Sequence, residues 1–412
     1  MTELRQIIVS SVSNCIEKNG IVSFMAILRC NDQAFHERGV RLGFANYVDF
    51  PVSAVAPVEL ATTSTVRRWM QAAKRSIKGS LIKSPLGAFL LMVGVLSPRA
   101  LIAVIKARRL EEPGCLHFHQ DVFCAFYGLR LLRRDTPKVL LLHSSDDPLN
   151  HLFVLFHGMR GTRYEKSIRA HFRRVLETMD CIVTLNERYA QTLRSEFPSH
   201  DIRCIYNTSS FASAACGMYD SGRSLADDGL RRLEIVAVGS LQYIKGFDLL
   251  VQAVAALSEV DRQRLHITIV GGGTEREPLQ AAIDAQSLQN EITLNGESND
   301  VASFLARADA YILTSRDEGF PIALIEASSF GLPIVSTRVG SIPEVFDKGS
   351  CLFMDAKIDS IRDALTALGR GTVDLRELAL RSQEVFDRKL SLDSFLDAYA
   401  DIFNCVERRH AR

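Results

Sequence analysis

Three charged residues in the second half of the chain have the types and spacing needed to hold an anionic, hydroxylated ligand. Glu318 and Glu326 are eight residues apart, and Lys245 closes a turn that follows an apolar run. A carboxylate accepts paired hydrogen bonds from the two hydroxyls of a ribose or a sugar ring, and a lysine ammonium is a compact positive charge. Together they would suit a ligand that combines phosphate groups with sugar hydroxyls.

The residues around Glu318 predict a turn from a strand to a helix. Residues 310–313 form an apolar run typical of a buried strand, and Gly319 and Pro321 mark a helix start. Glu318 then lies in the loop and Glu326 inside the helix. The N–H groups at a helix start favour an anion. Those expected to point at a ligand phosphate belong to Gly319, Phe320 and Ile322.

Two glycine-containing turns follow other predicted strands. Gly239 and Ser240 begin the turn that carries Lys245, and a glycine there lets the backbone approach a ligand beyond the carboxyl end of a strand. The second turn, 271–274, contains three glycines and suggests a dinucleotide-binding fingerprint. That fingerprint needs a further glycine at the position of Arg276, so a tight strand-to-helix turn is the favoured interpretation.

The elements that position these turns form a repeated pattern. Short, continuously apolar runs alternate with helical patterns along almost the whole chain, which predicts parallel strands covered on both faces in an α/β fold. A length of 412 residues favours two domains. The predicted parts are an N-terminal domain at 1–215, a linker at 216–231, a second domain at 232–390 and a C-terminal helix at 391–412 that packs back on the N-terminal domain.

The order and separation of these motifs resemble the retaining glycosyltransferases of family 4, the group 1 glycosyltransferases. The resemblance covers residues 233–347 and includes the G-x-L-x-x-x-K-G turn, the V-G-G-G turn and the E-x7-E motif within E-G-F-P-x-x-x-x-E. It implies the GT-B architecture, two Rossmann-like β/α/β domains facing a central cleft. It also implies transfer from a nucleotide-diphosphate sugar as co-substrate, without a further cofactor, to a glycan or lipid-linked acceptor with retention of configuration. The commonest setting of the family is bacterial cell-surface polysaccharide or glycolipid synthesis.

The resemblance assigns roles to individual residues. It implies that Lys245 binds the donor diphosphate and Glu326 the donor ribose, while Glu318 and the backbone around Pro321 hold the transferring sugar and phosphate. In the N-terminal domain the resemblance is looser. There it implies that His119 faces the acceptor and sugar, with His143 as second choice. The remaining implied contacts are Asn295 and Gly296 to the nucleobase and Gly20 to the diphosphate.

One position departs from the family pattern. Ser240 stands where the family usually has an arginine, and a hydroxyl does not replace a guanidinium fork on phosphate. Either Lys245 bears the diphosphate alone, a basic residue of the N-terminal domain helps, or donor affinity is low.

Other functions remain open from the sequence. A sugar-nucleotide 2-epimerase shares the implied fold, and a non-catalytic sugar-nucleotide-binding protein would explain Ser240. A Rossmann oxidoreductase is disfavoured by Arg276. The sequence contains no Asp-x-Asp, which agrees with the metal-independent chemistry that the resemblance implies. A formal net charge of +1 gives no reason to expect nucleic acid as a partner.

The segment 60–110 has an unusual composition. It contains ten basic residues and no acidic one, and within it residues 85–96 form an apolar stretch. A membrane-spanning helix needs roughly 20 residues, so this stretch is predicted to be too short to span. It is either a buried core helix with solvated basic flanks or an apolar patch that rests on an anionic membrane. Nine dispersed cysteines and the lack of a signal-peptide pattern favour a cytoplasmic location, with peripheral contact on the inner face of the membrane.

Overall fold

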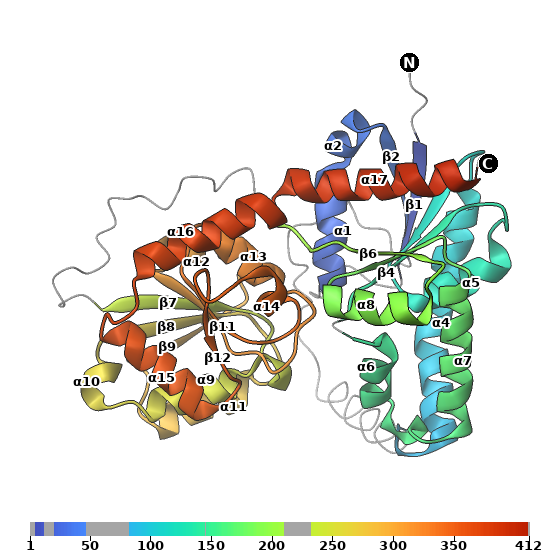
Figure 1. Cartoon of the computed structure of the whole chain (residues 1–412). Helices are drawn as coiled ribbons and strands as arrows, with labels where there is room; N and C mark the ends of the chain where they lie inside the picture. The colour runs from blue at the N-terminus through green and yellow to red at the C-terminus, as the bar shows by residue number, and fades with distance from the viewer. Residues whose placement is uncertain (1–4, 12–19, 47–81, 145, 210–231, 411–412) are drawn as a thin grey trace. The chain divides into compact units, whose positions relative to one another are not determined.

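The chain contains two α/β units in the computed structural model, which describes residues 5–11, 20–46, 82–144, 146–209 and 232–410 (Figure 1). Unit 1 comprises Met1–Ile205 and Asp397–Arg412, and unit 2 comprises Tyr206–Leu396. The sequence placed the end of the N-terminal domain at 215, ten residues after the observed end of the first segment. The predicted linker at 216–231 lies outside the described residues.

Unit 1 is built on a six-stranded parallel sheet with the strand order β2-β1-β3-β4-β5-β6. Its strands are β1 (Arg5–Ser11), β2 (Val40–Asn46), β3 (Leu116–His119), β4 (Lys138–Leu142), β5 (Cys181–Thr184) and β6 (Asp201–Cys204). Its helices are α1 (Gly20–Cys30), α2 (Asp32–Glu37), α4 (Pro85–Arg109), α5 (Val122–Leu131), α6 (Pro148–Leu155), the 3-10 helix η1 (His157–Met159), α7 (Arg163–Glu177) and α8 (Glu187–Glu196).

The last helix, α17 (Leu392–His410), contributes to unit 1 from Asp397 onward. Tyr399 is fully buried, and its ring centroid lies 5.8 Å from that of Phe24 and 5.5 Å from that of Phe118. Arg203 donates to the Asp401 carboxylate at 2.6 Å. Aromatic burial therefore attaches this part of the helix to unit 1, with an ion pair at the edge of the contact.

Helix α4 is longer than the sequence suggested. The predicted apolar stretch ended at residue 96, but the helix continues to Arg109 with Pro98 inside it. Gly94 and Pro98 are both exposed, so water can replace the hydrogen bond that proline cannot donate. Among the described residues, α4 is the one helix long and apolar enough to cross a membrane by length and composition, and 29% of its most apolar window is buried. The prediction that the stretch is too short to span was therefore wrong about its length.

Unit 2 is built on a second six-stranded parallel sheet, with the order β12-β11-β10-β7-β8-β9. Its strands are β7 (Leu233–Val238), β8 (Leu265–Val270), β9 (Ile292–Gly296), β10 (Ala310–Leu313), β11 (Ile334–Thr337) and β12 (Leu352–Met354). Its helices are η2 (Tyr243–Lys245), α9 (Phe247–Ala255), α10 (Glu259–Arg262), α11 (Arg276–Ala285), α12 (Val301–Arg307), α13 (Ile322–Ser329), α14 (Ile342–Val345), α15 (Ile358–Gly369), α16 (Leu375–Val385) and the π-helical turn η3 (Phe386–Leu390).

Each face of the unit 2 sheet has its own apolar core. On β7, Ile235 and Ala237 pack with α9, α11 and α15, whereas Val236 packs with α12, α13 and η3 on the other face. Figure 1 shows α9, α11 and α15 on one side of the sheet and α12, α13 and α16 on the other. Because both faces are buried, the strands are continuously apolar, as the sequence pattern suggested. The predicted fold class, α/β with two Rossmann-like domains, is confirmed, and the cleft between the domains stays a prediction.

Candidate functional site

The candidate site lies where the strand order of unit 2 reverses direction. Strand β10 pairs with β7 in parallel register, Ala310 with Ile235 and Tyr311 with Val236. The loops that follow these two strands therefore leave the sheet at the same carboxyl edge, at the switch point where open α/β sheets bind ligands. One loop carries Lys245 and the other carries Glu318.

Lys245 and Glu318 form an ion pair at this edge. The Nζ atom of Lys245 lies 2.5 Å from Oε1 of Glu318, and the Ser315 hydroxyl donates to the same oxygen at 2.8 Å. The two side chains are 23% and 12% exposed, so a ligand at the sheet edge can reach both of them. Two residues that the sequence assigned to one site from 73 positions apart are thus in direct contact.

The turn that carries Lys245 is held to the β10 loop by several further contacts. The guanidinium of Arg316 donates to both carboxylate oxygens of Asp248, at 2.7 and 2.6 Å, and to the Tyr243 carbonyl at 2.6 Å. It also lies over the Tyr243 ring, 3.9 Å from the centroid. The Thr314 hydroxyl donates to the Lys245 carbonyl at 3.1 Å. Sequence reasoning missed Arg316, since nothing in its local spacing indicates a partner near residue 248.

Gly246 allows this close approach. Its φ is +66°, and a Cβ there would lie 2.1 Å from the Thr314 carbonyl oxygen. Gly371 in the same unit has the same φ but nothing within 4 Å of the Cβ position. An alanine at either glycine would be strained by the positive φ, but only an alanine at Gly246 would also clash with the neighbouring loop. Comparing the two substitutions therefore isolates the effect of the clash.

We expect Gly246→Ala to destabilise the protein by about 3 kcal/mol or more, against about 1 to 2 kcal/mol for Gly371→Ala, because only the first adds a clash to the strain. Chemical denaturation of the full chain, followed by a signal from unit 2, measures both. Gly246→Ala should also displace Lys245 from Glu318. Equal destabilisation by the two substitutions would contradict the close approach of the loops.

Helix α13 begins at Ile322, and Pro321 is its N-cap residue. The first N–H groups of a helix have no intrahelical acceptor, so this end favours an anion beside Glu318. Phe320 is buried, with its ring 5.5 Å from that of Tyr206, so it can offer a ligand only its backbone. Pro321 has no N–H and contributes a fixed backbone turn rather than a hydrogen bond.

Two residues that follow the first segment of unit 1, Asn207 and Thr208, form hydrogen bonds within unit 2, one of them just before α13. The side-chain amide of Asn207 donates to the Phe320 carbonyl at 3.4 Å, and the Thr208 hydroxyl donates to the Leu390 carbonyl at 2.7 Å. Both residues are buried in unit 2, although the sequence assigned them to the N-terminal domain. These two hydrogen bonds explain why unit 2 begins before residue 207.

Gly319 is held by the loop that follows β11. The backbone N–H of Ser341 donates to the Gly319 carbonyl at 3.0 Å, and its hydroxyl approaches the same oxygen at 3.2 Å. Gly340, with a φ of +52°, passes so close that a Cβ would lie 2.2 Å from the Glu318 carbonyl oxygen. Gly340 and Ser341 lie within the range 233–347 that resembles the family, but the sequence analysis assigned them no role. The structure shows that they support the Glu318 loop.

Glu326 lies on α13, half-buried, and desolvation raises the pKa of its carboxyl to about 7. The Tyr311 hydroxyl on β10 is fully buried and has no hydrogen-bond partner among the described residues. Burial first, and then the charges of Glu318 and Glu326, hold the pKa of this hydroxyl well above its usual value. The two carboxylates therefore share one neighbourhood around Tyr311, and near neutral pH Glu326 exists in both protonation states.

The residues predicted to contact the nucleobase lie on the same sheet edge, at the end of β9. Asn295 is exposed, and Gly296, with a φ of +85°, accepts a hydrogen bond from the Gly271 N–H at 2.8 Å. Arg276 donates to the Leu294 carbonyl at 3.4 Å, beside the same turn. Gly239 directly follows β7, and its carbonyl oxygen would lie 1.8 Å from a Cβ on Gly271. The turns after β7, β8 and β9 thus form one continuous edge.

Ser240 is the residue that departs from the family pattern. It is half-buried in the turn after β7, next to Gly239. Two arginines near this edge of unit 2 are held elsewhere: Arg316 by Asp248 and Tyr243, and Arg338 over the Phe353 ring at 4.3 Å from the centroid. In the described part of unit 2, the cation paired with Glu318 is Lys245.

The remaining predicted residues belong to unit 1. Gly20 is the first residue of α1. His119 is fully buried, its Nδ1 lies 2.8 Å from the Ser10 hydroxyl, and a Cβ on Gly128 of α5 would lie 2.8 Å from its Nε2. Burial, then the charges of His117 and Lys138, hold the pKa of His119 well below its usual value. Its catalytic role stays a prediction, and the burial of the ring argues against contact with a sugar.

His143, the second choice, lies after β4 at the carboxyl edge of the unit 1 sheet. It is half-buried, its Nε2 lies 3.0 Å from Oε1 of Gln120, and desolvation lowers its pKa to about 3. A neutral imidazole at a strand end can accept or donate a proton to a ligand hydroxyl. Of the two histidines, His143 is better placed to meet an acceptor.

Two family models match the chain. Residues 229–377 match Glycosyl transferases group 1, and residues 65–208 match Glycosyltransferase Family 4. Together the two matches span most of the chain. The first covers the site residues of unit 2 from Gly239 to Ser341.

Curated relatives agree with these matches. One component of the human phosphatidylinositol N-acetylglucosaminyltransferase is 31% identical over 176 residues, 38% of this chain and 36% of that protein. N-acetyl-alpha-D-glucosaminyl L-malate synthase of Bacillus anthracis is 24% identical over 307 residues, 72% of this chain and 76% of the synthase. The match to the human protein thus spans well under half of that protein's length.

Solved structures show the same fold. HepE of Anabaena, in complex with UDP and glucose, has a TM-score of 0.65 at 15% identity and covers 98% of this chain and 100% of its own. Sucrose-phosphate synthase of Thermosynechococcus elongatus has a TM-score of 0.67 at 14% identity, over 99% and 100% of the two chains. At this level of identity the likeness supports the two-domain architecture.

Proposed function

Because the chain belongs to the group 1 glycosyltransferases, we propose that it moves a sugar from a nucleotide-sugar donor to a glycan or lipid-linked acceptor with retention of anomeric configuration. The observation that carries the proposal is the contact between Lys245 and Glu318 at the switch point of unit 2. A cation, a carboxylate and the free N–H groups of a helix start meet there. These are the groups that a sugar diphosphate needs.

In the proposed reaction, the bond between the anomeric carbon and the diphosphate oxygen breaks and the acceptor hydroxyl oxygen bonds to the anomeric carbon. The hydroxyl proton passes to the departing diphosphate, on whose oxygen negative charge develops. Lys245 and the N–H groups at the start of α13 stabilise this charge, which is catalysis by preorganised electrostatics. Glu318, released from Lys245, accepts hydrogen bonds from the sugar, and Glu326 accepts them from the ribose. In this proposal the protein supplies the positive charge, so transfer should not respond to a metal chelator.

The relatives guide the choice of donor and acceptor. HepE was solved with UDP and glucose, and a relative from Escherichia coli, 22% identical over 186 residues, is named an O-antigen biosynthesis glycosyltransferase. These names support uridine diphosphate sugars as the first donors to test. They also support a setting in cell-surface polysaccharide or glycolipid synthesis, whereas a place at the cytoplasmic face of a membrane stays a prediction.

A thermal-shift screen with a panel of nucleotide sugars tests the donor first, because a ligand that binds the folded state raises the unfolding temperature. We expect at least one nucleotide sugar to stabilise the protein, and Glu318→Gln to reduce that stabilisation. The best donor then enters a transfer assay, with the anomeric configuration of donor and product compared by NMR. Inversion would contradict the proposed retention. Interconversion of donor sugars without transfer would indicate an epimerase, and binding without turnover a non-catalytic protein.

A further inference from the structure

The end of unit 1 where α4, α6 and α7 meet exposes an unusual amount of aliphatic surface. Of the seven large hydrophobic side chains in the described residues that are more than half exposed, four lie here. They are Leu86 (54%) and Leu90 (58%) on α4, and Val154 (58%) and Leu155 (55%) on α6. An exposed apolar group of this kind marks an interaction surface more often than scattered single residues do.

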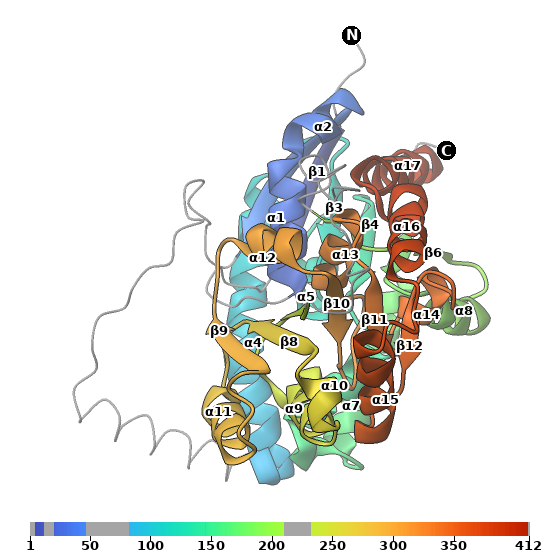
Figure 2. The same cartoon turned by 90° about the vertical axis from the view of Figure 1, so that its left-hand side faces the viewer.

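Two contacts bring these three helices together. A Cβ on Gly158, in η1 directly after α6, would lie 2.2 Å from the Ile82 carbonyl oxygen and 2.9 Å from that of Lys83. The ring of Phe89 on α4 stacks on that of Tyr164 on α7, with centroids 4.9 Å apart. Figure 1 and Figure 2 both show the start of α4 beside the start of α7 at one end of the unit.

Basic side chains accompany the aliphatic ones. Lys83, Arg160, Arg163 and Lys166 are all exposed, and residues 82–110 contain no acidic residue. We call these four residues and the four exposed aliphatic ones the α4–α6–α7 tip. Glu165 is the one acidic residue of the segment 154–166.

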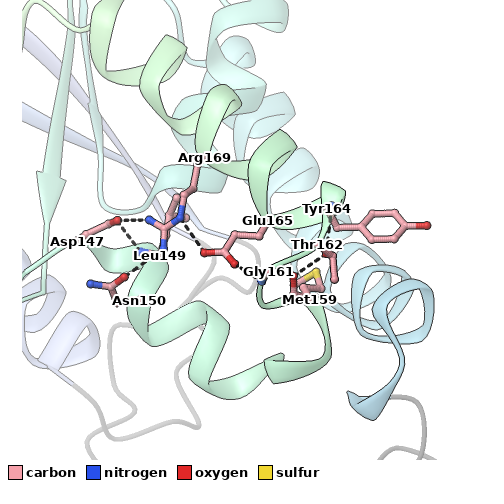
Figure 3. Close-up of polar contacts among 9 residues, drawn as sticks. All are labelled: Asp147, Leu149, Asn150, Met159, Gly161, Thr162, Tyr164, Glu165 and Arg169. Atoms are coloured by element: carbon pink, nitrogen blue, oxygen red, sulfur yellow. Dashed lines mark hydrogen bonds and ion pairs between the residues drawn. The ribbon is translucent and has the colours of Figure 1, made fainter.

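Two acidic side chains near the tip, Glu165 and Asp147, are both paired with Arg169 (Figure 3). Arg169 donates to Glu165 at 2.9 Å and to Asp147 at 2.5 Å. The second oxygen of Glu165 accepts the Gly161 N–H at 2.7 Å, and the second oxygen of Asp147 accepts the Leu149 N–H at 2.9 Å. Arg169 offsets the charge of one of these two carboxylates, so a single negative charge is left against the four exposed basic residues, and the tip stays basic.

The second half of α4 has a different role. Ala100, Ala103, Val104 and Ala107 are fully buried, with residues of β1 and β2 in the same core cluster. A helix fixed to the sheet along its second half can present its first turns to a bilayer but does not cross it while the unit is folded. The second half of α4 is thus a buried core helix, and the membrane-surface interpretation of segment 60–110 concerns only its first turns among the described residues. Five of the ten basic residues of that segment, Arg67 to Lys78, lie outside the described residues.

We propose that the α4–α6–α7 tip rests on the surface of an anionic lipid bilayer, with Leu86, Leu90, Val154 and Leu155 inserted between headgroups and the four basic residues on lipid phosphates. Charge complementarity selects this partner: aliphatic insertion combined with attraction to anionic lipid is how peripheral proteins bind membranes. This inference rests on the proposed function in one respect: membrane binding would serve the enzyme by bringing it to a lipid-linked acceptor. Vesicle binding itself is measured without donor or acceptor, so it can fail or succeed apart from sugar transfer.

The test is co-sedimentation of the full chain with vesicles of phosphatidylcholine alone and of phosphatidylcholine mixed with phosphatidylglycerol, at low and high salt. We expect binding to the anionic vesicles that high salt weakens. A charge variant, Lys83→Gln with Arg160→Gln, Arg163→Gln and Lys166→Gln, should bind roughly 600-fold more weakly, since each basic residue near the surface is worth about fivefold. An apolar variant, Leu90→Gln with Leu155→Gln, should lose about tenfold by losing inserted aliphatic area.

Matched controls come from unit 2. Val260→Gln with Leu380→Gln removes aliphatic side chains that are 63% and 57% exposed, and Arg376→Gln with Arg388→Gln removes exposed charge. Both controls should bind vesicles as the wild type does. All variants should keep the thermal shift with a nucleotide sugar, which separates this surface from the donor site.

Equal binding to neutral and anionic vesicles, or variants that bind as well as the wild type, would overturn the proposal. So would a dimer that the apolar variant dissociates in the absence of any vesicle binding, because the occupant would then be a second copy of the chain.

Discussion

Replacing Lys245 with methionine is expected to lower the rate of sugar transfer about 100-fold or more, and to weaken nucleotide-sugar binding. Loss of one preorganised group that stabilises developing negative charge costs about 10² to 10³ in rate in other enzymes. The turn after β7 has Ser240 where the family usually has an arginine, and Arg316 is already paired with Asp248. Lys245 is the one cation in the described residues of this turn, and Arg276, at the neighbouring turn, is engaged with the Leu294 carbonyl.

The substitution also leaves Glu318, 12% exposed, without its ion-pair partner. A loss of stability from this unpaired carboxylate has to be separated from a loss of function. The double variant Lys245→Met with Glu318→Gln removes both charges, so it should recover thermal stability without recovering donor binding. Lys357→Met is the matched control, because Lys357 is exposed in the same unit and lies 3.8 Å from Asp355. Unchanged nucleotide-sugar affinity in Lys245→Met would remove the basis of the proposed site.

When its carboxyl is ionised, Glu326 is expected to lower the free energy of unfolding and to strengthen nucleotide-sugar binding. Burial raises the pKa of its carboxyl to about 7 from an ordinary value of 4.5. The folded state then binds more protons than the unfolded state between these two values, so stability falls as the pH rises from about 4.5 through 7. At about 1.4 kcal/mol per pKa unit, the loss is on the order of 3 kcal/mol above pH 7. A glutamine at this position has no such ionisation to oppose folding.

Unfolding of the wild type and of Glu326→Gln at pH 5 and pH 8 measures this effect. The stability of the variant relative to the wild type should increase between the two pH values, whereas the control Glu384→Gln, at an exposed partner of Arg381, should show no such trend. Nucleotide-sugar binding should change in the opposite direction. Glu326→Gln should bind about tenfold or more weakly at pH 8, because hydrogen bonds to an ionised acceptor are the stronger ones.

Wild-type affinity should also tighten as the pH rises through 7, since the ionised carboxylate is the better acceptor for ribose hydroxyls. A variant that binds as tightly as the wild type at pH 8 would show that Glu326 is not a donor ligand. A stability difference that is the same at pH 5 and pH 8 would show that its carboxyl is not desolvated in the folded protein.

The sequence by itself determined the fold class and the residues of the donor edge. Parallel strands buried on both faces are continuously apolar, and each is followed by a turn whose glycines and charges stand next to it in the chain. The distances from Val238 to Lys245 and from Leu313 to Glu318 are therefore local properties. Once β7 and β10 are expected to be neighbours, the contact between Lys245 and Glu318 follows.

Only the tertiary structure decided which groups pair across long separations and which are buried. Two examples are the ion pair between Arg316 and Asp248 and the hydrogen bond from Asn207 to the Phe320 carbonyl. Both depend on the packing of loops that are distant in the sequence, which no local spacing encodes. The burial of His119 depends on Gly128 of α5, which leaves space for the ring. Helix α4 continues through Pro98 because both of its halves are anchored by packing, and local propensity is weaker than such tertiary contacts.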